Sequence, residues 1–281
     1  MKNQSGSGFT LLELLVGMAI MGIVLTALVN YFSQSSRLAA QSSSRAEMQQ
    51  EILNAQQLIA GKLKEAWYIY PAGSTIKMTD SELTQRPSGN SANANVWTVG
   101  TDPILAMIIP PKDLTVSCGT TAPASQEGCY RFLSYFPVKR SLWVKKTGAD
   151  SWRNPGPDDP NGDTWILAEY RGTMSTAFSA GTYPPTTPPT VPASNTPNIL
   201  SDYVAPTVET TGYTTTANTY TMFSLLSATG AATSATNPVT GVTLSLATTR
   251  KTGSQLLRLP NSTDEYNLTI YPTNLGKVAA N

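Results

Sequence analysis

The chain has 281 residues, a formal net charge of +1 and 13% charged residues, against about 25% in ordinary soluble domains. It contains no histidine, which excludes a Ser-His-Asp triad, a Cys-His pair and every histidine-ligated zinc or iron site. The near-neutral balance, rich in Ser, Thr and Asn, favours a solvated extracellular surface over a nucleic-acid binder.

The N-terminal segment begins with a short polar stretch, residues 1–8, that ends in Gly8. The apolar run at 9–32 would form a helix of about 36 Å, long enough to cross a bilayer. Lys2 favours a cytoplasmic position for the first residues. A cleavable secretory signal is the alternative, but its apolar region would be shorter, about 7–15 residues. The sequence therefore predicts a single-pass membrane helix.

Glu13 lies inside this apolar run, where a carboxylate costs about 2.5–3.5 kcal/mol on insertion scales. It needs either a partner or a proton. Phe9 precedes it by one helical turn and lies on the same helix face. A cut before Phe9 would create an α-amino group whose positive charge suits Glu13. A glutamate that reaches toward the membrane interface is the alternative, and it leaves the Gly8–Phe9 junction unexplained.

The sequence GFTLLEL at residues 8–14 resembles the processing site of type IV prepilins, pseudopilins and competence pilins. The resemblance is specific over residues 8–32 and weaker beyond them. It implies cleavage by a prepilin peptidase between Gly8 and Phe9, and N-methylation of the new Phe9 amine. It also implies that Glu13 pairs with the terminal amine of a neighbouring subunit during assembly. Major pilins usually carry a proline where Asn30 stands, so this chain is more similar to a minor pilin or pseudopilin.

Residues 33–70 are predicted to continue the helix as an amphipathic segment. They contain no proline and are rich in Ala, Gln, Glu, Leu and Lys, which favour helix. The whole rod should run from Phe9 to about Ile69. Its second half carries one apolar stripe suited to packing on a sheet, formed by Met48, Ile52, Ala55, Ile59, Leu63 and Ala66.

Residues 71–281 are predicted to form a β-rich extracytoplasmic head, with a Pro/Thr-rich insertion near 179–198. The predicted class is α+β, in which a long N-terminal helix packs on an antiparallel sheet as in type IV pilins. Whether the head is one subdomain or two is left open. The expected strands are Ile104–Ile109, Tyr130–Val138, Ser141–Lys146, Thr164–Tyr170, Thr219–Leu226, Val239–Leu246 and Tyr266–Tyr271.

Two cysteines, Cys118 and Cys129, flank a stretch rich in Gly, Thr and Pro. Buried unpaired thiols are one interpretation. We favour a disulfide, which would imply an oxidising compartment and stabilise the fold by about 2–3 kcal/mol.

Two polar groups in the head are candidate binding sites. In the first, Asp158, Asp159, Asn161 and Asp163 resemble the start of a calcium loop, but Thr164 stands where such a loop needs glycine. A solvated turn is therefore expected and no metal site is predicted.

The second group joins cations to neighbouring aromatic residues, a combination that can bind single-stranded DNA. A strand pair with its aromatics inward and its charges outward is favoured, and DNA binding stays open as the lesser alternative. The cations are Lys139, Arg140, Lys145 and Lys146, and the aromatic residues are Tyr130, Phe132, Tyr135, Phe136 and Trp143.

The head resembles the PilW type of minor pilin and the similar J-type pseudopilins, through the 104–109 strand, the cysteine loop and the WILAEYRG segment at 165–172. The resemblance implies a structural subunit without catalytic residues or cofactor, held in the inner membrane and then built into an extracellular pilus. Its partners would be the prepilin peptidase, the major pilin, other minor pilins and the inner-membrane assembly platform. Motility, adhesion and DNA uptake are the processes such subunits serve. The alternatives are a periplasmic pseudopilus subunit for type II secretion, and a membrane-anchored binding protein or enzyme.

Overall fold

The structure is a computed structural model that describes residues 10–79, 82–86, 94–119, 123–145, 152–162, 164–174, 183–192, 197–205, 221–252 and 255–277. The chain comprises two units, residues 1–47 and 48–281, and each is described by itself. All of the described strands lie in the second unit, which also holds the hydrophobic core.

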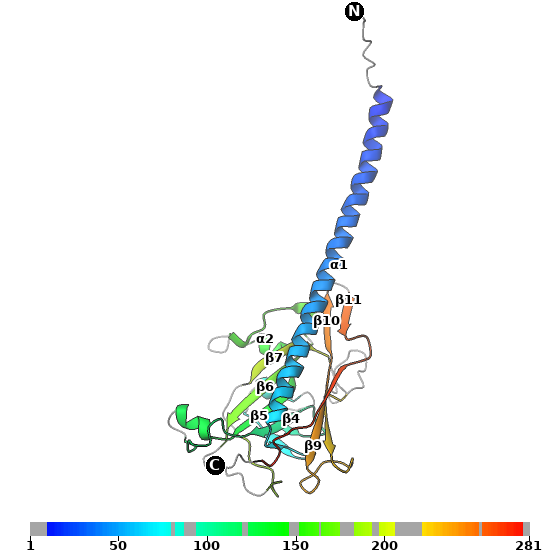
Figure 1. The fold of residues 1–281 in the computed structure, drawn as a ribbon. Coiled ribbons are helices and arrows are strands. Elements are labelled where there is room, and N and C mark those ends of the chain that lie inside the picture. The colour runs from blue at the N-terminus through cyan, green and yellow to red at the C-terminus, as the bar shows by residue number, and fades with distance from the viewer. Residues whose placement is uncertain are drawn as a thin grey trace, which may run out of the picture. The chain divides into compact units, whose positions relative to one another are not determined.

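The helix α1 runs from Leu11 to Glu65 and contains 55 residues (Figure 1). A continuous supply of good helix formers and the absence of proline permit this length. Within the first unit its apolar side chains are exposed, including Leu11, Ile23 and Phe32. By length and composition α1 is apolar enough to cross a membrane.

The C-terminal part of α1 lies in the second unit and supplies the predicted stripe to the core. Ile52, Ile59 and Leu63 are each 0% exposed, whereas Leu58 is 56% exposed. The stripe packs in one cluster with side chains from both major sheets of this unit. The helix is therefore the shared centre of the head's larger core.

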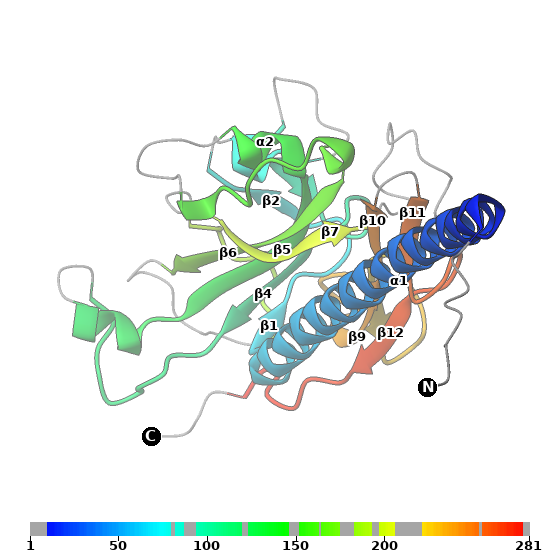
Figure 2. The same cartoon turned by 90° about the horizontal axis from the view of Figure 1, so that it is seen from above.

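The main sheet has seven strands in the order β1-β4-β5-β6-β7-β10-β11, and every neighbouring pair is antiparallel (Figures 1 and 2). Its centre is the β5–β6 pair, in which Leu133 stands opposite Arg171 and Tyr135 opposite Glu169. The strands are β1 (Tyr68–Ile69), β4 (Leu105–Ile109), β5 (Arg131–Lys139), β6 (Trp165–Thr173), β7 (Asn198–Val204), β10 (Thr248–Thr252) and β11 (Gln255–Leu259).

The two faces of this sheet are both buried, because alternate side chains enter different clusters. Leu133 and Tyr135 face the helix cluster, whereas Phe132 and Phe136 enter a second cluster rich in aromatic rings. A two-stranded sheet, β2 (Thr75–Lys77) and β3 (Val96–Thr98), contributes to the second cluster through residues such as Trp97.

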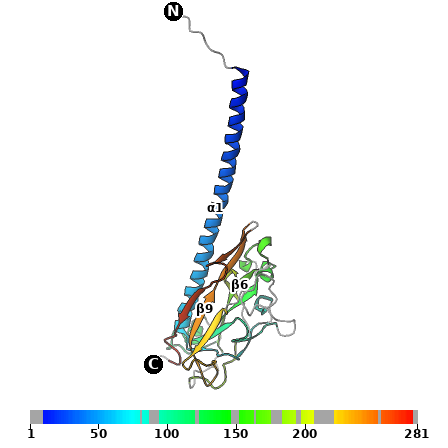
Figure 3. The same ribbon diagram turned by 90° about the vertical axis from the view of Figure 1, so that its right-hand side faces the viewer.

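A three-stranded antiparallel sheet with the order β12-β9-β8 completes the head; Figure 3 shows it in yellow to red. Its strands are β8 (Phe223–Ser227), β9 (Val239–Leu246) and β12 (Tyr266–Ile270). The buried amide of Gln56 donates to the carbonyl oxygens of Leu244 (3.3 Å) and Tyr266 (2.9 Å). These bonds fix α1 to the three-stranded sheet through its neighbouring strands β9 and β12.

The α+β class and a β-rich head after a long helix are confirmed. Two local predictions are wrong. The helix ends at Glu65, and Tyr68–Ile69 form the edge strand β1 instead of a last helical turn. The segment predicted as strand Ser141–Lys146 begins as a short helix, α2 (Arg140–Val144), because Arg140 and Trp143 are buried on one helical face.

Candidate functional site

The start of α1 is organised around Thr10 and Glu13. The backbone N–H of Thr10 donates to Oε2 of Glu13 at 3.0 Å, and the N–H of Glu13 donates to the Thr10 hydroxyl at 3.3 Å. The hydroxyl also donates to Oε2 at 3.0 Å. This reciprocal pair is a capping box, which satisfies backbone donors at a helix N-terminus.

Glu13 thus bonds to Thr10, a partner in its own chain that was not predicted. The spacing of Thr10 and Glu13, three residues apart before an apolar run, is the sequence signal that identifies such a cap. The predicted processing residues Gly8 and Phe9 lie outside the described residues.

The disulfide loop has the predicted connection. Cys118 and Cys129 are joined with their Cα atoms 4.5 Å apart. Gly128 is required beside the bridge, because a Cβ there would lie 1.9 Å from the carbonyl oxygen of Val116. The loop folds back by backbone hydrogen bonds from Lys112 and Asp113 to the carbonyl of Glu127. The bridge therefore constrains the chain between β4 and β5.

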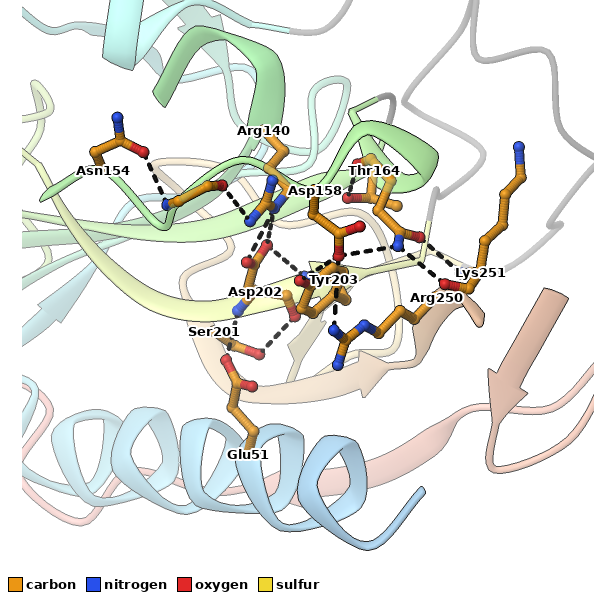
Figure 4. A network of polar contacts seen from close by, with 12 residues as sticks. Glu51, Arg140, Asn154, Asp158, Thr164, Ser201, Asp202, Tyr203, Arg250 and Lys251 are labelled. Atoms are coloured by element: carbon orange, nitrogen blue, oxygen red, sulfur yellow. Dashed lines mark hydrogen bonds and ion pairs between the residues drawn. The ribbon is translucent and has the colours of Figure 1, made fainter. Parts of the chain in front are cut away.

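A buried polar network in the head was not predicted (Figure 4). The guanidinium of Arg140 is 1% exposed, and its Nε donates to both carboxylate oxygens of Asp202 at 3.1 and 3.0 Å. A second nitrogen donates to the carbonyl of Gly156 at 2.9 Å. Burial raises the pKa of Asp202, although Arg140 opposes that rise. Burial likewise raises the pKa of Glu51 on α1, whose carboxylate accepts the N–H of Asp202 at 2.6 Å.

The network continues through Tyr203, a non-glycine residue with φ of 55°. Its ring lies against the guanidinium groups of Arg140 and Arg250, 5.2 and 4.5 Å from the ring centre. Its hydroxyl donates to Asp158 at 2.8 Å, and burial raises the pKa of Tyr203 to about 12. The network joins α1, β7 and β10 to the segment before β6, so its contacts hold these elements together.

The calcium-like run is engaged in this network. Asp158 accepts from Tyr203 and from the Asn161 amide at 3.0 Å, and Arg250 lies 3.6 Å from it. The Asn161 side chain also bonds both the N–H and the carbonyl of Lys251. Asp163 lies outside the described residues. The oxygens of Asp158 and Asn161 thus have protein partners that connect the turn to β10.

The predicted cation–aromatic group does not form one exposed surface, because most of its aromatic residues and Arg140 are buried whereas Lys139 is exposed. Tyr135, Phe136 and Trp143 are fully buried, and Arg140 is occupied by Asp202. Lys139 is exposed, with its amine 5.9 Å from the ring centre of Trp165. Lys146 lies outside the described residues. The aromatics point inward, as the favoured interpretation expects.

The N-terminal segment and the fold class are both similar to those of type IV pilin-like proteins. Residues 1–29 match the family described as the prokaryotic N-terminal methylation motif. The chain is also 41% identical over 59 residues to the pilin-like protein PilA3 of Thermus thermophilus. That match covers 21% of this chain and spans 25% of the relative's length. No solved structure gives a significant match. The apolar helix and the motif are consistent with membrane anchoring and association with a pilus.

Proposed function

We propose that this protein is a minor pilin, a structural and non-catalytic subunit of a type IV pilus. The observation that carries the proposal is the start of α1, where Glu13 follows the predicted cleavage point within an exposed apolar helix surface. A prepilin peptidase cuts between Gly8 and Phe9, and the Phe9 amine is methylated. Asn30 in place of the usual proline, and a large head over residues 71–281, favour a minor over a major subunit.

Assembly uses the exposed apolar surface of α1. Before assembly the helix anchors the chain in the inner membrane, and in the filament it packs against the helices of other pilins. Glu13 exchanges its bonds to Thr10 for a charge-assisted bond to the α-amino group of a neighbour. In a membrane-like environment a fully paired carboxylate is strongly favoured over an unpaired one. This exchange sets the register between subunits, and it occurs at the assembly platform with the major pilin and other minor pilins.

The mass of the mature protein tests the processing step. We expect loss of residues 1–8 and gain of one methyl group, measured by intact-protein mass spectrometry on the membrane fraction. Gly8→Ser should give full-length, unmethylated protein, because the peptidase needs the small residue before the cut. An intact N-terminus in the wild type would contradict the pilin role and favour a membrane-anchored binding protein or enzyme.

The pairing role of Glu13 needs a variant that separates it from helix capping. We expect Glu13→Ala to be cleaved normally but to be depleted about tenfold from sheared filaments, as quantified by immunoblot; tenfold corresponds to about 1.4 kcal/mol. Thr10→Ala removes the hydroxyl that caps the Glu13 N–H and keeps the carboxylate, so it should enter filaments nearly normally. Equal depletion of both variants would show that capping, and not intersubunit pairing, is the function of Glu13.

A further inference from the structure

A pocket of about 530 Å³ opens in the head between the last turns of α1 and the ends of β4, β5 and β6. Its apolar lining includes Ile109 and Leu133, which belong to the helix-side core. Four cations also line it, Lys62, Lys112, Arg131 and Arg171. The volume lies within the range of small-molecule sites, about 300–1,000 Å³. The pocket thus combines an apolar surface with positive charge.

Two of the four cations are already paired. Lys62 lies 3.0 Å from Glu65, and Arg171 forms an ion pair with Glu169. Glu169 is held in place by the hydroxyl of Tyr135, which donates to its other oxygen at 2.9 Å. These carboxylates are therefore satisfied by the protein, and they neutralise only Lys62 and Arg171.

The other two cations of the pocket are Lys112 and Arg131. Lys112 and Arg131 form no ion pair within the described part of the chain. The Nε of Arg131 is buried, and it donates no hydrogen bond to any described residue. A buried donor of this kind is unfavourable until an acceptor reaches it. The backbone of Lys112 is fixed, because its N–H donates to Glu127 in the disulfide-closed loop at 2.9 Å.

We propose that this pocket binds an organic phosphate monoester. A phosphomonoester carries a charge of about −1.5 to −2 at neutral pH and three strong acceptor oxygens. These match two cations of one pocket that form no ion pair among the described residues. A single carboxylate would neutralise only one of them. The guanidinium of Arg131 can bind phosphate oxygens through its planar fork, and Lys112 supplies the second charge. The organic part of the ester rests on Ile109 and Leu133.

The proposal is independent of the pilus role, because every lining residue lies in the unit 48–281 and none in the processing segment. It is tested by isothermal titration of the full-length protein in a neutral detergent with phenyl phosphate. Inorganic phosphate, benzoate and a short oligothymidylate are titrated at the same ionic strength. Phenyl phosphate should bind about tenfold more tightly than inorganic phosphate or benzoate.

Three variants test whether phenyl phosphate binds in this pocket. Arg131→Gln and Lys112→Gln should each raise the Kd for phenyl phosphate about tenfold, since each removes a charge-assisted bond. Lys77→Gln on strand β2 removes an exposed charge outside the pocket and should leave the Kd unchanged. Thermal melting monitors folding, and Lys112→Gln is the safer variant because Lys112 lies in the loop after β4.

Several results would overturn the proposal. One is that phenyl phosphate does not bind, and another is that the three variants weaken binding equally. Equal affinity for inorganic phosphate would indicate a general anion site without an organic component. Tighter binding of oligothymidylate, lost in the same two variants, would assign the pocket to a polymer instead.

Discussion

Arg140 is a charge that the head buries almost completely, and the surrounding residues make this possible. An unpaired guanidinium in the interior would be strongly unfavourable, so Asp202 neutralises it and Gly156 accepts a further bond. The carboxylate of Glu51 then lies close to that of Asp202, across the hydrogen bond from the Asp202 N–H. Three carboxylates, those of Glu51, Asp158 and Asp202, therefore share the positive charge supplied by Arg140 and Arg250.

The raised pKa of Glu51 gives the head a specific pH dependence. Burial is its main cause, and the charge of Asp202 adds to it, while the Asp202 N–H, Ser201 and Arg250 oppose it. A carboxyl whose folded-state pKa exceeds its unfolded value binds more protons when folded, so its contribution to stability decreases as pH rises through that interval. At pH 7, well above the unfolded pKa, the burial of this carboxyl therefore reduces the stability of the head relative to acidic pH.

We therefore expect Glu51→Gln to be more stable than wild type at pH 7, because the amide oxygen can still accept the Asp202 N–H without the charge. The difference should vanish near pH 4, below the unfolded pKa of about 4.3. Urea unfolding at both pH values measures it. Asp202 is present in both proteins, but its charge acts on Glu51, so the measured difference includes the repulsion between the two carboxylates. A variant less stable than wild type at pH 7 would contradict this expectation.

The sequence alone identified some of these residues as important but could not identify the others. Glu13 stands out because one charge interrupts a long apolar run, a signal that is local in sequence. The pairing of Arg140 with Asp202 joins residues 62 positions apart, and no local pattern encodes it. The cations of the pocket come from α1, the β4–β5 connection, β5 and β6, so only the sheet register brings them together.

At the scale of elements, the C-terminal part of α1 is the main contributor to the core. Ile59→Ala should reduce the free energy of unfolding by about 2–5 kcal/mol, because it leaves a cavity between both sheets. Leu58→Ala is the matched control, since the neighbouring side chain is 56% exposed. Its effect should stay within about 0.5 kcal/mol. Chemical unfolding followed by tryptophan fluorescence distinguishes the two, and equal losses would refute this packing.

Strand prediction succeeded for several long apolar or alternating runs, but it missed β1, β2, β3, β7, β10 and β11. Strand β9 has the predicted bounds, Val239–Leu246. Strands β10 and β7 were missed, because TTRKT has no apolar residue and NILSDYV follows a proline-rich stretch. They exist because β10 pairs with both β11 and β7. Such strands depend on partners far along the chain, so local propensity does not identify them.

At the scale of the whole molecule, the core belongs to the second unit alone. Both large clusters of buried residues lie between Ile52 and Ile270. We therefore expect residues 48–281, expressed in an oxidising compartment, to be soluble without detergent and to unfold cooperatively. A shorter piece, 66–281, lacks every stripe residue except Ala66 and should aggregate. Circular dichroism and gel filtration test both, and an insoluble 48–281 would show that the first unit is needed for folding.

Segments far apart in the sequence meet beside the last turn of α1. The N–H of Gly276 donates to the carbonyl of Trp67 at 2.9 Å, and the Thr273 hydroxyl donates to that of Lys64 at 3.4 Å. Strand β12 also contacts the helix from far along the chain. The hydrogen bond from Gln56 to Tyr266 joins residues 210 positions apart. Contacts between such distant residues form slowly, because closing a long loop has an entropic cost. During biosynthesis part of the apolar stripe on α1 therefore stays exposed until the strand at Tyr266–Ile270 has left the ribosome. Completion of this head is a late event, and a chaperone that shields the stripe in the meantime would raise the yield of folded protein.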